Sequence, residues 1–270
     1  MKRYRLVIIP FFLFLFVSCD KNNNLSLLTL QDDLTLGFQV SEQIADDPAS
    51  YPILDDTDHQ EAYNYLNAIT NQILNSGEVA YRTEFVWQMH IIKDDNVLNA
   101  FATPGGYIYV YTGLIKYLDT VDDLAGVLGH EIAHADLRHS SRSLQRQYGV
   151  TILLSILLGE DPSMLAQITA QLAGGLAGLS FSREFESESD ARSVEYLAAT
   201  EYACNGAASF FEKLEEQGLS GGTPEFLSTH PSPTNRITDI NSKASSDGCN
   251  TALSSDDTRG MTYEEFQALL

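Results

Sequence analysis

Basic side chains are scarce in this chain of 270 residues: 16 lysines and arginines stand against 37 aspartates and glutamates, a net charge of −21 at pH 7. Such a surface repels the phosphates of nucleic acids and the headgroups of anionic lipids, so neither is an expected partner. Long apolar runs are lacking as well. The N-terminal run Val7–Val17 has eleven residues, well short of the about 20 that a transmembrane helix needs. The composition therefore favours one globular domain with a single core.

Cysteine is also rare, with three residues, and the first of them stands in an informative context. Three basic residues among the first five positions precede the apolar run, and Phe16-Val-Ser-Cys19 ends it. This order is typical of a secretory signal, and its last four residues resemble a bacterial lipobox. We expect residues 1–18 to be a removed signal peptide, Cys19 to carry lipid, and residues 19–34 to form a polar tether. An uncleaved short anchor is the alternative.

Removal of residues 1–18 leaves 252 residues with a net charge of −24. The protein would then face the periplasm or the cell exterior, attached to a bacterial membrane through its N-terminal lipid; which membrane stays open. Cys204 and Cys249 are the remaining cysteines. In an oxidising compartment an isolated pair favours a disulfide over two free thiols, so we expect these two to be bonded.

The most informative motif is His130-Glu131-Ile132-Ala133-His134. Histidines four apart on a helix lie on one face, one turn apart, which suits two ligands of a single zinc ion. Thr120-Val-Asp-Asp123 upstream is typical of a capping box that starts such a helix. On an otherwise apolar helix, buried imidazoles need polar partners, and one shared metal supplies them. We therefore expect one Zn²⁺ per chain, with Glu131 taking the proton of the attacking water.

A catalytic zinc site needs a third protein ligand. His139 lies about 140° around a continuing helix from His134, so it is not expected to reach the metal. The acidic stretch Ser182–Asp190 is a better source. Glu186 and Asp190 lie one helical turn apart, so Glu186 can bind the metal while Asp190 orients a ligand histidine. Glu184 and Glu188 are the competing carboxylates on the same helix.

Further motifs occur in a fixed order along the chain. They are Asn99-Ala-Phe-Ala-Thr-Pro-Gly-Gly-Tyr-Ile-Tyr-Val-Tyr-Thr-Gly-Leu114, the motif of residues 130–134 with Arg138-His139, Ser182-Arg183, Glu186 with Asp190, Ser228-Thr-His-Pro231, and Arg236-Ile237. Over residues 35–245 this series resembles the zinc metalloendopeptidase family that includes HtpX, BepA and the CaaX prenyl protease. The chain lacks the internal spanning helices of the membrane-embedded members. No helical repeat array follows the peptidase motifs as in BepA, so no tethered chaperone module is expected.

The resemblance implies an α+β fold, mostly helical, of the gluzincin type, with a small sheet whose edge strand borders the cleft. It also implies zinc held by His130, His134 and Glu186, with Glu131 as general base. Residues 35–245 would form the peptidase domain. Residues 246–270 are polar and acidic, and we expect them to form a peripheral tail.

The segment Tyr107–Tyr111 alternates tyrosine with Ile108 and Val110, which predicts a strand with its three tyrosines on one face. If this strand lies at the sheet edge, Tyr107, Tyr109 and Tyr111 would bind an extended peptide by strand addition. An interior strand is the alternative, and the resemblance favours the edge.

His230 stands before Pro231, and Arg236 follows six residues on. We hypothesise that His230 faces the open side of the zinc, where it either latches the fourth ligand position or, with Arg236, stabilises the oxyanion. A surface histidine in a turn is the alternative.

Taken together, these features predict a lipid-anchored zinc metalloendopeptidase of the cell envelope that cleaves extended or misfolded polypeptides in protein quality control. A non-catalytic, zinc-stabilised, chaperone-like binding lipoprotein is the main alternative, and a zinc hydrolase of other amides is a second one. Glu131 discriminates between the first two, because a binding module has no need of a carboxylate beside the ligands.

Overall fold

The computed structural model describes residues 18–19, 21, 25–173, 180–219, 225–231, 235–255 and 260–270. Most of the expected signal peptide and the lipid expected on the Cys19 side chain lie outside the described residues. A short antiparallel pair, β1 (Ser18–Cys19) with β2 (Leu25–Ser26), precedes the domain. None of the described helices combines the length and the apolar character needed to cross a bilayer.

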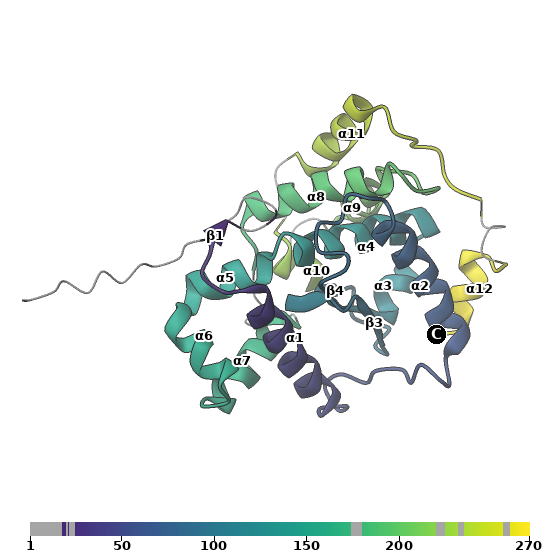
Figure 1. The fold of residues 1–270 in the computed structure, drawn as a ribbon. Helices are drawn as coiled ribbons and strands as arrows, with labels where there is room; N and C mark the ends of the chain where they lie inside the picture. The colour runs from purple at the N-terminus through teal and green to yellow at the C-terminus, as the bar shows by residue number, and fades with distance from the viewer. Residues whose placement is uncertain are drawn as a thin grey trace, which may run out of the picture.

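The domain is mostly helical, and its helices surround one small sheet (Figure 1). Along the chain the elements are α1 (Leu30–Ala45), α2 (Gln60–Leu74), β3 (Gln88–Ile92), β4 (Ala100–Ala102), a 3-10 turn (Pro104–Gly106), β5 (Tyr107–Tyr111), α3 (Thr112–Tyr117), α4 (Val121–Asp136), α5 (His139–Tyr148), α6 (Val150–Leu157), α7 (Pro162–Leu172), α8 (Arg183–Leu197), α9 (Gly206–Glu216), α10 (Glu225–Thr229), α11 (Arg236–Asp247) and α12 (Tyr263–Ala268). The expected fold class, mostly helical with a small sheet, is confirmed.

The sheet has three strands in the order β3-β5-β4, with β3 parallel and β4 antiparallel to β5. Ile108 and Val110 pack against the apolar side chains of α2, α4 and α9. The three tyrosines of β5 point to the other face and pack with apolar side chains of α1, α6 and α7. The alternation of β5 therefore places its side chains on the two faces as predicted, and both faces are buried.

The prediction that β5 is an edge strand is wrong. Its backbone is paired on both sides, because β4, a strand of three residues that the sequence pattern did not reveal, occupies the side that was expected to be free. Tyr107, Tyr109 and Tyr111 are buried, and the Tyr109 ring stacks on Phe101 and His90. They therefore have no free strand edge through which to bind a peptide, and α4 packs against β4 as well as against the Ile108 and Val110 face of β5.

Helix α4 is the centre of the domain. Thr120 and Asp123 form the expected capping box, and Asp122 and Asp123 place negative charge in its first turn, where the helix dipole favours it. Glycines allow α4 to pack closely on two other helices. A Cβ at Gly126 would lie 2.0 Å from the backbone nitrogen of Ala207 in α9, and one at Gly129 would lie 2.6 Å from a side-chain oxygen in α8. This close packing fixes α4 relative to α8.

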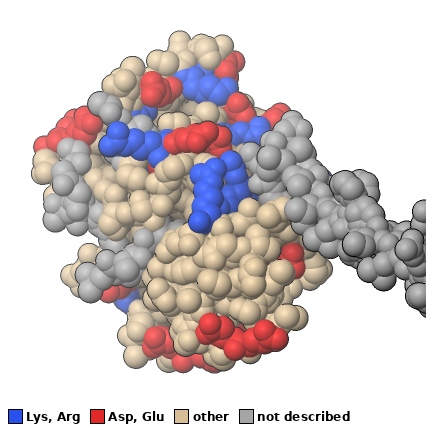
Figure 2. All heavy atoms as spheres, turned by 90° about the vertical axis from the view of Figure 1, so that its left-hand side faces the viewer, with Lys and Arg blue, Asp and Glu red and all other residues tan. Residues whose placement is uncertain are grey.

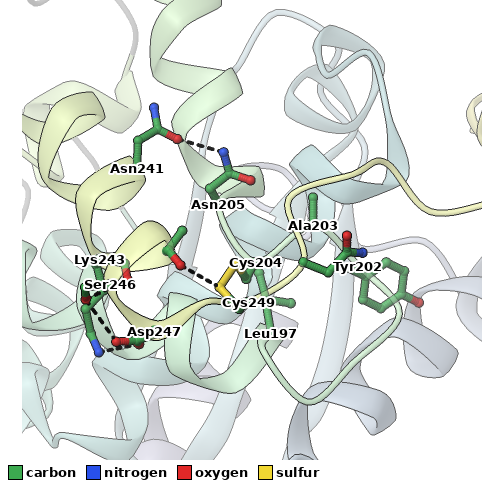
Figure 3. The surroundings of a disulfide bond; sticks show 12 residues. Leu197, Tyr202, Ala203, Cys204, Asn205, Asn241, Lys243, Ser246, Asp247 and Cys249 are labelled. Atoms are coloured by element: carbon green, nitrogen blue, oxygen red, sulfur yellow. Dashed lines mark hydrogen bonds and ion pairs between the residues drawn. A yellow bond between two sulfur atoms is a disulfide. The ribbon is translucent and has the colours of Figure 1, made fainter.

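Two C-terminal features tie the end of the chain to the domain. A disulfide joins Cys204 to Cys249, the expected pair, and links the segment before α9 to the segment after α11 (Figure 3). The expectation that residues 246–270 form a peripheral tail is wrong. Helix α12 buries Tyr263 and Phe266, and the Phe266 ring stacks on Tyr65 of α2 with centroids 4.4 Å apart. Two aromatic residues one turn apart give α12 an apolar face that docks on the core.

Candidate metal centre

Four side chains from three segments meet in the interior of the domain. His130 and His134 come from α4, Glu186 from α8, and His230 directly follows α10; one ligand atom from each lies within 4.8 Å of all the others. The Nε2 atoms of His130 and His134 are 2.9 Å apart. A carboxylate oxygen of Glu186 lies 3.3 Å from His134 Nε2, and the other lies 3.4 Å from His130 Nε2. The structure thus brings together the three predicted ligands and His230.

This donor set fits zinc. Imidazole nitrogens and a carboxylate oxygen are its usual ligands, and structural and catalytic zinc sites are four-coordinate. None of the four residues exposes more than 1% of its surface, and Glu186 Oε2 makes no hydrogen bond among the described residues apart from its ion pair with Arg236. Buried polar atoms that converge in this way are costly unless a shared partner satisfies them, and a cation would do so.

Asp190 and Arg236 support the ligands from behind. Asp190 Oδ1 lies 2.8 Å from His130 Nδ1, which leaves the Nε2 atom of that ring facing the other ligands. Arg236 Nη2 donates to Asp190 at 2.7 Å and lies 3.1 Å from Glu186 Oε2. Burial alone would raise the pKa of Asp190, but Arg236 and His130 hold it below its usual value. Asp190 therefore stands where the sequence argument expected it, ionised and in contact with a ligand histidine.

Arg236, which the sequence predicts to stabilise an oxyanion, is buried and faces acidic side chains of α8. Its guanidinium stacks on the Phe211 ring at 3.9 Å and is directed at the carboxylates of α8. In this conformation it balances the charge of the ligand Glu186. Stabilisation of an oxyanion by Arg236 would need a different arrangement and stays a prediction.

His139 has a place that the sequence argument missed. Helix α4 ends at Asp136, and Arg138, with a φ of 59°, turns the chain sharply before α5 begins. His139 is therefore not on a continuing helix. Its Nδ1 lies 3.1 Å from Nδ1 of His134, and its Nε2 lies 3.0 Å from Glu188. His139 is outside the cluster of four but contacts His134, and Glu188 contacts His139 and is likewise outside the cluster; Glu184 is exposed.

Glu131 lies beside the ligands with its carboxylate toward His230. One of its oxygens is 3.5 Å from His230 Nε2, and neither oxygen has a hydrogen-bond partner among the described residues. Burial is the main cause that raises the pKa of Glu131. A carboxyl with a raised pKa is suited to accept and return a proton near neutral pH.

His230 is held on the other side by aromatic packing. Its ring stacks on Phe226 with centroids 4.3 Å apart, and its backbone nitrogen donates to the Phe226 carbonyl. Phe226 in turn donates its backbone N–H to the carbonyl of Leu98, just before β4. The prediction that His230 faces the metal site is in accord with this geometry. The glycine-containing segment that precedes α10, residues 218–222, lies partly outside the described residues.

Two aromatic residues at the site were not anticipated. Phe181 stacks on His134 at 4.1 Å, and Phe226 stacks on His230. Phe181 directly precedes the Ser182-Arg183 motif, which is the one local signal that could have pointed to it. No local sequence motif marks Phe226, which reaches the site through the tertiary structure.

Comparison with known proteins agrees with the geometry. The model of peptidase family M48 matches residues 60–244. The beta-barrel assembly-enhancing protease of Yersinia pestis is 30% identical over 229 residues, which cover 80% of this chain and 45% of that protein. The beta-barrel assembly-enhancing protease of Escherichia coli (strain K12) is 29% identical over 229 residues, which cover 81% of this chain and 45% of that protein. The mitochondrial metalloendopeptidase OMA1 of Schizosaccharomyces pombe is 29% identical over 177 residues, which cover 65% of this chain and 51% of that protein. The chain thus spans about half the length of these relatives.

Proposed function

This chain belongs to peptidase family M48, and from that premise we propose that it is a zinc metalloendopeptidase of the bacterial cell envelope. Its substrates would be extended or misfolded polypeptides. The observation that carries the proposal is the buried cluster of His130, His134, Glu186 and His230 with the Glu131 carboxylate beside it. The zinc predicted from the sequence is supported by the donor set and by the family.

The proposed roles follow from position. His130, His134 and Glu186 hold the metal; Asp190 keeps the His130 ring oriented, and Arg236 keeps the Glu186 carboxylate ionised. When bound, zinc supplies a Lewis acid toward the scissile carbonyl and the attacking water. Glu131 takes the proton of that water on its carboxylate and passes it to the leaving amine. Its burial favours both steps, because it brings the pKa of the carboxyl nearer to neutrality.

His230 latches the site in the conformation described here. Its Nδ1 lies 3.2 Å from Glu186 and 3.3 Å from His130 Nε2, where a fourth ligand would stand, and its Nε2 faces Glu131. One imidazole thus occupies both the ligand position and the space in front of the base. The segment that carries it is also bonded to Leu98, beside the sheet edge. A substrate would have to displace it.

The latch predicts that His230→Ala raises the rate of peptide cleavage while zinc is retained. The measurement is initial rate on an unfolded protein substrate together with metal content. Phe226→Leu removes the ring that stacks on His230, together with its contacts to Phe210 and Phe211, and should raise the rate by less. A fall of about 10²-fold in the His230 variant would instead assign the ring to oxyanion stabilisation, and an unchanged rate would leave it without either role.

For the place of action, the resemblance of Phe16-Val-Ser-Cys19 to a lipobox supports lipid on Cys19 and anchoring at a membrane with the domain outside the cytoplasm. Two of the relatives are named for beta-barrel assembly, which favours work on envelope proteins. Mass spectrometry of the mature chain tests the anchor, since an unmodified Cys19 would contradict it.

The proposed activity is tested with an unfolded, casein-type substrate and purified full-length protein. We expect cleavage that a zinc chelator abolishes and that added zinc restores. A folded, zinc-loaded preparation, including the His230→Ala variant, that cleaves no polypeptide would overturn the proposal and favour the binding lipoprotein.

A further inference from the structure

Helix α6 presents apolar side chains to solvent. It buries Leu153 and Ile156 against the domain, while Leu154 and Leu158, one turn apart on the outer side, are 43% and 73% exposed. Leu158 is the most exposed large apolar side chain among the described residues. A helix whose outer face is as apolar as its inner face is unusual in a domain that is acidic elsewhere. An exposed apolar face of this kind is typical of a site that binds another protein or a membrane.

The charge of the surrounding segment departs from that of the rest of the chain. Between Asp136 and Glu184 the acidic residues are Glu160 and Asp161, against four arginines, of which Arg138 is buried and paired with Asp33. Figure 2, which views the side that carries α5 and α6, shows a broad area without charge, bordered by basic groups on one side and by acidic groups at the far rim. Arg146 of α5, the helix before α6, is exposed, and its guanidinium lies 4.7 Å from the centre of the Phe185 ring. The repulsion that excludes anionic surfaces elsewhere is therefore weakest here.

The N-terminal segment approaches the domain on the same side. The backbone N–H of Leu27 donates to Gln145 of α5 at 3.0 Å, and Arg138 donates to the Leu28 carbonyl. Leu27 is itself exposed. In Figure 1, β1 and α5 lie next to each other, with α6 beyond α5. The chain that leads from Cys19 thus joins the body next to the apolar face.

We propose that the face formed by α5, α6 and Leu27 rests on the surface of the lipid bilayer. Leu154 and Leu158 would enter the boundary between headgroups and acyl chains, and Arg146 would lie at the level of the lipid phosphates. The inference rests on the proposed lipid anchor, which would hold this side of the domain near the membrane. With the domain tethered there, even weak apolar contacts form at a high local concentration of lipid.

A fluorescent label tests the contact in the full-length, anchored protein on phosphatidylcholine vesicles. The environment-sensitive dye NBD is attached to Leu158→Cys and, as the matched control, to Leu253→Cys. Leu253 is 63% exposed and lies in the connection between α11 and α12, at the opposite end of the domain from α6 (Figure 1). The native pair Cys204–Cys249 is bonded and does not react.

We expect emission from position 158 to shift to the blue on vesicles and to be quenched by lipids that carry a nitroxide, with neither change at position 253. Equal, water-like emission from both positions would overturn the proposal. A blue shift at 158 without quenching by the nitroxide lipid would also overturn it, because another protein copy and not lipid would then cover the face.

A second variant distinguishes the lipid contact of this face from the effect of the N-terminal lipid anchor and from catalytic activity. Leu154→Asp, labelled at Leu158→Cys, should lose the blue shift while the protein still floats with the vesicles and cleaves a soluble peptide at the unaltered rate. Retention of the shift would contradict the assignment. The intact mass of each preparation shows whether Cys19 carries lipid, so failure of the anchor is recognised independently.

Discussion

Asp190→Asn should weaken zinc binding without removing a ligand. In the wild-type protein Asp190 Oδ1 lies 2.8 Å from His130 Nδ1 and 2.7 Å from Arg236 Nη2, and the residue is buried. Asparagine keeps the shape but loses the charge that orients the imidazole and raises its basicity. Loss of such a contact costs about 10- to 100-fold in metal affinity, which corresponds to about 1.4–2.7 kcal/mol.

The same change should destabilise the metal-free protein. Arg236 keeps Glu186 at 3.1 Å but loses the nearer of its two carboxylates. Removal of one partner from a buried charge costs about 3–5 kcal/mol when nothing replaces it, so we expect about 3 kcal/mol or less.

Competition with a chromophoric chelator measures the zinc affinity, and urea unfolding measures the stability. Glu184→Gln, on the exposed side of the same helix, is the matched control and should change neither quantity. Wild-type zinc affinity in the Asp190 variant would refute the supporting role.

Two further predictions concern stability. Replacing both cysteines of the Cys204–Cys249 bond with serine should lower the free energy of unfolding in urea by about 3–4 kcal/mol, because the bond closes a loop with a sequence separation of 45; an unchanged midpoint would contradict this. Burial lowers the pKa of His90 from 6.5 to about 4. The unfolded chain therefore binds a proton here below about pH 6.5 and the folded chain only below about pH 4, so stability falls as the pH falls through that window, by at most about 3 kcal/mol. His90→Phe should flatten this part of the pH dependence of unfolding, and an unaltered slope would count against it.

Much of the site could be predicted because its main parts are local. Two histidines four apart on one helix, and a glutamate and an aspartate four apart on another, are fixed by helical periodicity whatever the rest of the fold does. The capping box at Thr120 and the alternation in β5 are local in the same sense. Each of these features lies within about one or two turns, and each is present in the structure.

What could not be predicted depends on contacts between distant segments. The order of the strands depends on β4, whose three residues are too few to show a pattern of their own. The docking of α12 on α2 joins positions about 200 residues apart, and a short acidic segment gives little sign of it. A continuous helix would direct His139 away from His134. Arg138 instead has a left-handed backbone conformation, which ends the helix and brings the His139 ring into contact with His134. The turn is a tertiary feature, since Arg138 is held by Asp33 of α1.

Glu131 is proposed to act chemically beside a metal that it does not bind, and the most direct test is Glu131→Gln, measured for zinc content and cleavage rate on one preparation. Glutamine keeps the volume next to His230 but accepts no proton. We expect the zinc content of the wild-type protein together with a rate reduced about 10²- to 10⁴-fold. Cleavage at the wild-type rate, in a preparation shown to be free of other proteases, would contradict the account.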